Sequence, residues 1–208
     1  MSIALGGIVA FIFRGMNLLV ALALIFLCSH QLDKDGYGTF VLGLTVVGIV
    51  NAATGGLTAA TGVQISSHRR PAGMALANGG VRGLALGATA VIAGFGASTL
   101  YAGEAHREAI AVGLSCAAVI VSSVVAGTFL GREAFVRYNM ALVAPPLFSL
   151  GLITFAFFGL DKPSPAVALE MYALGQWLAI VLLLVTAGRT YLRGLSLHAP
   201  VARQIIGF

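Results

Sequence analysis

The sequence predicts an all-α fold: a polytopic membrane bundle of about six transmembrane helices with both termini in the cytoplasm. Only 9% of the 208 residues are charged and 59% are apolar, whereas an ordinary soluble domain carries about 25% charged residues. A soluble fold of this size would lack the polar residues needed to cover its surface, so lipid must surround most of the chain. At roughly 20 apolar residues per span, the length leaves room for about six spans.

Six apolar runs are the predicted spans. They cover residues 3–28, 39–65, 74–100, 109–130, 138–160 and 167–187. Each run exceeds the roughly ten alternating residues of a membrane β-strand, and a helix satisfies its own backbone groups in lipid. No repeat or linker divides the chain, so we expect one domain over residues 1–208.

The segments between the runs support these boundaries. A polar loop at 30–38 ends in the turn-rich residues 35–38, and a basic segment at 68–71 closes the second run. Charged turns at 104–108 and 131–137 bound the fourth run. A loop with two prolines at 161–165 precedes the sixth. The first run lacks the basic leader of a signal peptide, since residues 1–13 carry no charged side chain, so we expect a retained helix.

The distribution of charge predicts the orientation. One set of loops and the C-terminal tail hold seven arginines, which are Arg69, Arg70, Arg132, Arg137, Arg189, Arg193 and Arg203. The opposite set holds only Lys34, Arg107 and Lys162. Basic loops stay on the cytoplasmic side, so both chain ends are expected there, which requires an even number of spans. Membrane orientation also explains the net charge of +5 better than binding to nucleic acid does.

The sequence shows no strong catalytic or cofactor motif. The phosphate-binding GxxxxGK[ST] pattern is absent, and both lysines lie in outer loops. His106 with Glu104 and Glu108 reads as a solvated turn rather than a metal site. Ser122 lies in an apolar run without a nearby histidine to act as a base. We therefore expect a protein that is not an enzyme and that uses no metal or cofactor.

Arg14 and Arg82 are the candidate substrate-binding residues, because each is a cation within an apolar run. A charged side chain at the bilayer centre costs about 2.5–3.5 kcal/mol on insertion scales and usually faces a cavity. Asn17 lies three residues after Arg14, and Asn78 lies four before Arg82, so each pair shares a helix face. Two guanidinium groups and two amides in one cavity would suit a multiply charged anion such as pyrophosphate. The alternative is that both arginines extend to the cytoplasmic interface.

Other residues within the runs indicate a cavity and bending. Asn51 and Gln176 could line a cavity or form hydrogen bonds between helices. The pair Pro145–Pro146 is expected to kink the fifth helix. The 27 glycines include a GxxxGxxxG run at Gly79, Gly83 and Gly87, which favours close packing of helices.

Three stretches resemble the N-terminal six-helix lobe of polysaccharide-biosynthesis flippases, in the multidrug/oligosaccharidyl-lipid/polysaccharide exporter superfamily. The first is the arginine-bearing opening helix with the loop at 31–40, similar to the family's L-G-x-x-x-Y-G-x-F turn. The second is the run of small residues at 55–57, and the third is the link between the fourth and fifth helices at 127–138.

This resemblance implies a function. Such proteins pass a lipid-linked oligosaccharide from the cytoplasmic to the outer leaflet by alternating access between two six-helix lobes. Arg14 then matches best the arginines thought to meet the diphosphate, and Arg82 matches less well. The resemblance implies a multi-pass protein of the bacterial inner membrane whose partners are membrane lipid, the polyprenyl-diphosphate substrate and, functionally, glycosyltransferases.

The chain departs from this family in length, because its members have 12 to 14 helices. Residues 200–208 resemble the entry to a seventh helix that is cut off. A lone lobe could transport only with a second lobe, supplied by a second copy or by another half. The alternatives are a drug or small-solute exporter of the same superfamily and a non-transporting fragment or scaffold. An exporter coupled to cations would need an acidic residue within the spans, and none lies in mid-span.

Overall fold

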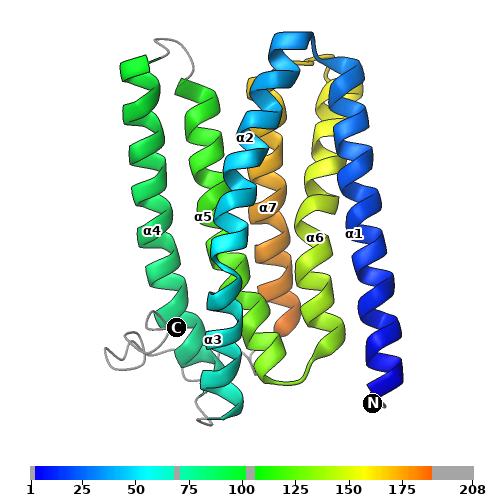
Figure 1. Ribbon diagram of the computed structural model, residues 1–208, viewed down its shortest axis with the longest axis vertical. Coiled ribbons are helices and arrows are strands. Elements are labelled where there is room, and N and C mark those ends of the chain that lie inside the picture. Colours follow the sequence, from blue (N-terminus) through cyan, green and yellow to red (C-terminus); the bar gives the residue numbers. More distant parts are fainter. Residues whose placement is uncertain (1–2, 68–70, 102–105, 189–208) are drawn as a thin grey trace.

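A computed structural model of the chain describes residues 3–67, 71–101 and 106–188. Within these ranges the chain forms helices that run alternately up and down, and no strand (Figure 1). The elements in order are α1 (Ile3–Gln31), α2 (Lys34–Ala53), α3 (Gly55–Ser66), α4 (Ala72–Tyr101), α5 (His106–Gly131), α6 (Phe135–Thr154), the π-helix η1 (Phe155–Gly159) and α7 (Pro165–Ala187). The prediction of an all-α helix bundle is confirmed.

Five stretches of the described chain are long and apolar enough to cross a membrane. They are Gly7–Gln31, Lys34–Ser66, His106–Gly131, Phe135–Gly159 and Pro165–Ala187. The glycine-rich α4 runs beside them over 30 residues (Figure 1). The chain is therefore a multi-pass membrane protein. The start of α1 and the end of α7 lie at the same end of the bundle, as an even number of passes requires.

Local sequence signals set several helix starts. Asp33 caps α2 by accepting a hydrogen bond of 3.1 Å from the backbone N–H of Gly36. Ser164 caps α7 in the same way, with a 3.2 Å bond from Val167 N–H. A proline follows at the first position of α7, where its missing N–H costs nothing.

The second predicted span is broken, which the sequence analysis did not foresee. It begins at Lys34 rather than near residue 39, and Thr54 divides it into α2 and α3 with φ −88° and ψ 0°. The hydroxyl of Ser123 on α5 donates a 3.2 Å hydrogen bond to Thr54 Oγ1, so the neighbouring helix supports the break. The two glycines that follow Thr54 have open space around them.

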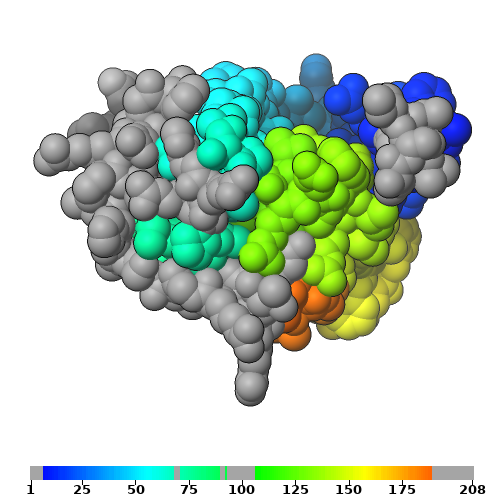
Figure 2. Space-filling model, turned by 90° about the horizontal axis from the view of Figure 1, so that it is seen from below, coloured from blue at the N-terminus to red at the C-terminus, as the bar shows by residue number. Residues whose placement is uncertain are grey.

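Helix α5 is the central element of the bundle. It packs against α2, α3, α4, α6 and α7, and its buried residues include Val124 and Phe129. The edges are formed by α4, which packs mainly on α5, and α1, which packs mainly on α6 (Figure 1). Seen from below, α1 lies at the margin and the α5–α6 connection lies near the middle of that end (Figure 2).

Part of the orientation argument lies outside the described residues. This holds for Arg69, Arg70, Glu104 and the tail from residue 189, including the expected start of a seventh helix at 200–208.

Candidate functional site

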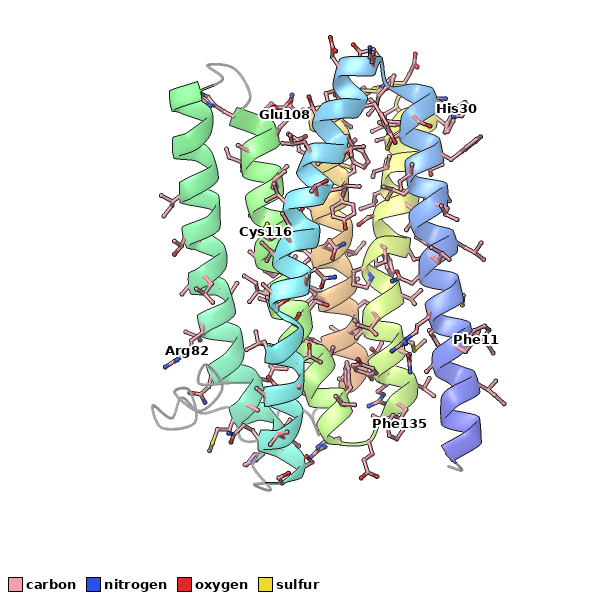
Figure 3. All side chains as sticks on the ribbon, viewed as in Figure 1. Phe11, His30, Arg82, Glu108, Cys116 and Phe135 are labelled. Atoms are coloured by element: carbon pink, nitrogen blue, oxygen red, sulfur yellow. The ribbon has the colours of Figure 1, made fainter. Side chains whose placement is uncertain are left out.

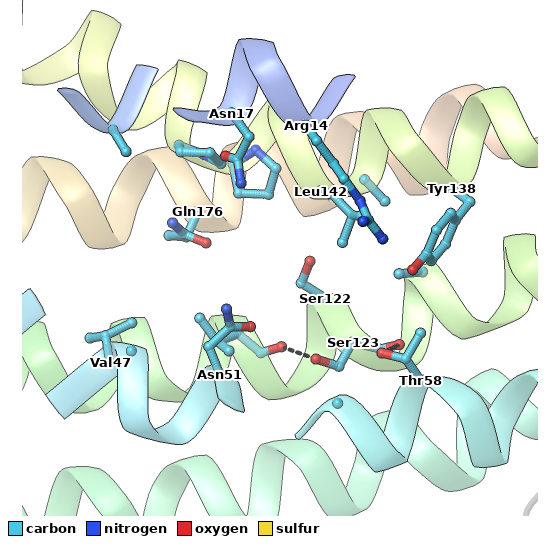
Figure 4. Close-up of a pocket in the computed structure, with 18 of the residues that line it drawn as sticks. Arg14, Asn17, Val47, Asn51, Thr58, Ser122, Ser123, Tyr138, Leu142 and Gln176 are labelled. Atoms are coloured by element: carbon cyan, nitrogen blue, oxygen red, sulfur yellow. Dashed lines mark hydrogen bonds between the residues drawn. The ribbon is translucent and has the colours of Figure 1, made fainter. Parts of the chain in front are cut away.

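A cavity of about 710 Å³ opens between α1 on one side and α2 with α3 on the other (Figure 4). It is lined by Arg14, Asn17, Ala21, Leu44, Val47, Gly48, Asn51, Gly55, Thr58, Ala59, Val119, Ser122, Ser123, Ala126, Leu130, Tyr138, Ala141, Leu142, Pro145, Pro146, Tyr172 and Gln176. The lining combines apolar side chains with amides and hydroxyls. The volume is in the range typical of small-molecule sites.

Helix α1 contributes one face to the cavity. Arg14, Asn17 and Ala21 recur at intervals of three and four residues, which places them on the same side of a helix. Because α1 packs on α6 and makes few contacts with α2, this face stays open. Arg14 and Asn17 are exposed, and their side chains extend into the cavity (Figure 4).

The back of the cavity is formed by α5. Val119, Ser122, Ser123 and Ala126 follow the same helical spacing. The single hydrogen of the Ser123 hydroxyl is shared between Thr54 Oγ1 at 3.2 Å and the carbonyl oxygen of Val119 at 3.0 Å. Thr58 of α3 donates a 3.1 Å bond to the carbonyl oxygen of Ser123. These bonds fix the hydroxyl groups of Ser123 and Thr58 and join α3 to α5.

The remaining wall comes from α6 and α7. Pro145 and Pro146 lie within α6 and line the cavity. A proline has no N–H, so the carbonyls of Ala141 and Leu142, which also line the cavity, lose their usual helical donors. Helix α6 continues through both prolines, and a kink there stays a prediction. From α7, Gln176 is 4% exposed and contributes a buried amide to the wall.

Arg14 is the one charged side chain among the described lining residues. It forms no hydrogen bond or ion pair with any other described residue. No acidic residue is part of the described lining. An unpaired guanidinium in a water-filled cavity attracts anions, and its fork of donors matches the oxygens of phosphate or carboxylate.

The expectation that Arg14 and Arg82 converge on one cavity is wrong. Neither Arg82 nor Asn78 lines the cavity, and Arg82 points away from the bundle (Figure 3). The reason is that α5 stands between α4 and the cavity. One face of α5 carries Ser122 and Ser123 toward the cavity, while its other face, with Ile120 and Val124, packs against the glycines of α4.

Asn78 is buried in the α4 interface instead. It is 3% exposed, and its side-chain amide donates a 2.7 Å bond to the carbonyl oxygen of Met74 on its own helix. Asn78, like Arg82, therefore lies away from the cavity.

Asn51 and Gln176, for which the sequence analysis left open a place in a cavity or hydrogen bonds between helices, are among the lining residues, and so are hydroxyl groups that it did not place there. Thr58, Ser122, Ser123 and Tyr138 all line the cavity. The signal available in the sequence was the spacing of the serines with Val119 and Ala126, which marks one small and polar face on an apolar helix.

The described residues contain no cluster of three or more His, Cys, Asp or Glu side chains able to hold a metal ion. The His106 turn is only partly described, because Glu104 falls outside. Near the starts of α5 and α7, Arg107 is paired with Glu170 through two hydrogen bonds of 2.9 Å.

No protein-family model matches the chain, and no curated protein does. Its fold is similar to an outward-facing multidrug resistance transporter of the MATE family in the MOP superfamily, with a TM-score of 0.72 and 19% identity. It is also similar to a MOP superfamily transporter from Pyrococcus furiosus, with a TM-score of 0.70 and 18% identity; the pocket of that protein is described as having reverse polarity, which suggests a different function. Each alignment covers 96% of this chain but only 49% and 48% of those proteins.

These likenesses establish the fold. The described helices follow the fold of about half of each of these two structures, and the chain spans about half their length.

Proposed function

We propose that the chain is one lobe of a flippase that carries a polyprenyl-diphosphate-linked oligosaccharide across the bacterial inner membrane by alternating access. In this role it acts as a carrier rather than an enzyme, downstream of the glycosyltransferases that build the saccharide. The proposal rests on one observation: Arg14 has no partner among the described residues, and it lies in a cavity whose described lining contains amides, hydroxyls and apolar groups but no acid.

Each part of the lining has a counterpart in such a substrate. The Arg14 guanidinium would bind diphosphate oxygens in pairs. Asn17, Asn51 and Gln176 offer both donors and acceptors, which suit the hydroxyl groups of a saccharide. The apolar part of the lining, which includes Leu44 and Leu142, would contact the first isoprene units.

A drug or small-solute exporter is the second candidate, and the likeness to a multidrug transporter favours it. A cationic drug would be repelled by Arg14, because the described lining of this lobe holds no carboxylate to bind the drug's charge. The carboxylate would have to come from a second lobe. A neutral or anionic solute would fit the same lining. Direct comparison of the two substrate classes therefore decides between these candidates.

Transport requires a second wall for the cavity, which is open between α1 and α2–α3. We propose that a second six-helix lobe supplies this wall, either as another copy of this chain or as a separate half. A chain that stays monomeric would instead be a non-transporting scaffold. Light scattering of the purified protein, with the detergent contribution subtracted, gives the mass that separates one lobe from two.

The test is a flipping assay in proteoliposomes. A fluorescent polyprenyl-diphosphate oligosaccharide is placed in both leaflets, and an impermeant quencher reports how fast the inner pool reaches the outside. Arg14→Gln should slow flipping by about tenfold to a hundredfold, because bonds to a charged group are worth about 1.5–3 kcal/mol. Arg14→Lys should retain part of the rate, since it keeps the charge but loses the paired geometry.

Arg107→Gln is the matched control, because it removes an arginine far from the cavity. Flipping that is unchanged in Arg14→Gln would refute the anion-binding role. Export of a cationic dye by wild type, without any flipping, would support the drug exporter instead.

A further inference from the structure

Arg82 has no place in the proposed transport site, yet it is a cation on α4, the 30-residue helix that runs beside the five apolar spans. It is half-buried on α4, and its side chain points outward, away from the bundle (Figure 3). Exposed apolar side chains lie close to Arg82 along α4. Val81 and Leu84 are each 51% exposed, and Leu86 is 56% exposed. A face of this composition is turned toward lipid.

The charge of Arg82 is not neutralised by the described protein. It forms no hydrogen bond or ion pair with another described residue. Arg107 provides the contrast, since its guanidinium binds both oxygens of Glu170. An arginine that faces lipid without a carboxylate needs its charge met by another anion or by water.

The depth of Arg82 along α4 identifies which anion is within reach. The helix has 30 residues and is therefore about 45 Å long, which is about 15 Å more than the hydrocarbon core. If α4 extends equally beyond both boundaries, the Cα atom of Arg82 lies about 8 Å inside the boundary nearer Ala72. An arginine side chain can extend back over this distance and reach the level of the phosphates.

We propose that Arg82 binds the phosphate of an anionic phospholipid, at a lipid site on the outer face of α4. The acyl chains of this lipid lie along Val81, Leu84 and Leu86. By the distribution of basic residues this end of the bundle is cytoplasmic, where bilayers carry anionic lipid that attracts basic side chains. The site is separate from the Arg14 cavity, so it stands or falls independently of the transport function.

Native mass spectrometry of the full chain in detergent tests the proposal. Phosphatidylglycerol or phosphatidylcholine is titrated in, and the affinity for the first bound lipid is measured. Wild type should prefer phosphatidylglycerol, and Arg82→Gln should weaken that lipid by about fivefold, the contribution of one basic residue near a membrane surface. Arg82→Lys should keep most of the affinity. Inorganic phosphate should not compete, because it lacks the acyl chains.

Arg107→Gln is the control, because the Arg107 guanidinium already pairs with Glu170. This substitution should leave lipid binding unchanged. A phosphatidylglycerol analogue with a photoreactive acyl chain should label the α4 peptide in wild type and label it less in Arg82→Gln. Equal phosphatidylglycerol affinity in wild type and Arg82→Gln would overturn the proposal. Equal binding of phosphatidylcholine, or competition by inorganic phosphate, would also overturn it.

Discussion

Gly127 of α5 lies so close to α3 that a Cβ atom at this position would stand 2.6 Å from the carbonyl oxygen of Thr58. One turn further along, a Cβ atom at Gly131 would lie 2.7 Å from the carbonyl oxygen of Gly62. The missing side chains let the two backbones approach beside the cavity, as small residues do between membrane helices.

Gly127→Ala should therefore destabilise the bundle. The added methyl group meets backbone atoms that cannot rotate away, and overpacking of this kind costs about 1–3 kcal/mol. Thermal unfolding in detergent, followed by circular dichroism, should show a lower Tm. Gly56→Ala is the control on α3, because a Cβ atom there has no neighbour within 4 Å. An unchanged Tm for Gly127→Ala would show that α3 and α5 are not packed this closely.

The contact between α4 and α5 can be tested on a single helix. A Cβ atom at Gly87 would collide with Ala117 and lie 2.6 Å from its Cα atom, whereas one at Gly80 meets nothing within 4 Å. Gly87→Ala should lower the Tm. Gly80→Ala should leave it equal or higher, because alanine favours a helix by up to about 1 kcal/mol over glycine. Equal effects of the two substitutions would contradict the structure, in which Gly87 faces α5 and Gly80 does not.

Ser149 joins α6 to α7 through its hydroxyl group. Its Oγ lies 2.8 Å from the carbonyl oxygen of Tyr172 and 2.9 Å from that of Pro145, so the single hydrogen is shared between two acceptors. Ser149→Ala should cost about 0.6 kcal/mol, the average for interhelical hydrogen bonds in a membrane protein. Unfolding in a mixed-micelle denaturant titration measures this free energy.

Ser29→Ala is the matched control for Ser149, because the exposed Ser29 hydroxyl bonds the carbonyl oxygen of Phe26 on its own helix. It should leave the free energy of unfolding unchanged. If both alanine variants lowered the free energy of unfolding equally, the Ser149 bond between α6 and α7 would contribute no more than a bond within one helix.

The ion pair of Arg107 and Glu170 should contribute little to stability, even though its geometry is bidentate. The arginine side chain is 65% exposed, and solvent screens such pairs. Arg107→Gln and Glu170→Gln should each leave the Tm close to wild type, and any coupling in the double variant should vanish at high salt. A large coupling that survives high salt would show that the pair is shielded from water in the assembled protein.

The amino-acid sequence by itself determined that lipid surrounds most of the chain, that the fold is all-helical, and where the spans approximately lie. Hydropathy and length act along one dimension, and the six predicted runs coincide with the helical rods of the structure to within a few residues at most ends. Polar residues within the apolar runs of α1, α2 and α7 could also be singled out from the sequence, because a polar group in an apolar run needs a partner or water wherever the helix is placed. Arg14, Asn17, Asn51 and Gln176 do lie on the cavity wall.

Only the tertiary structure decided which side of each helix faces the cavity. Arg14 and Arg82 occupy similar depths in the sequence pattern, but depth does not fix the position of a helix in the bundle. The glycine face of α4 packs on α5, and this leaves Arg82 pointing away from the bundle while the opposite face of α5 carries Ser122 into the cavity. The break at Thr54 has the same origin, since its support comes from Ser123, which is 69 residues away along the chain.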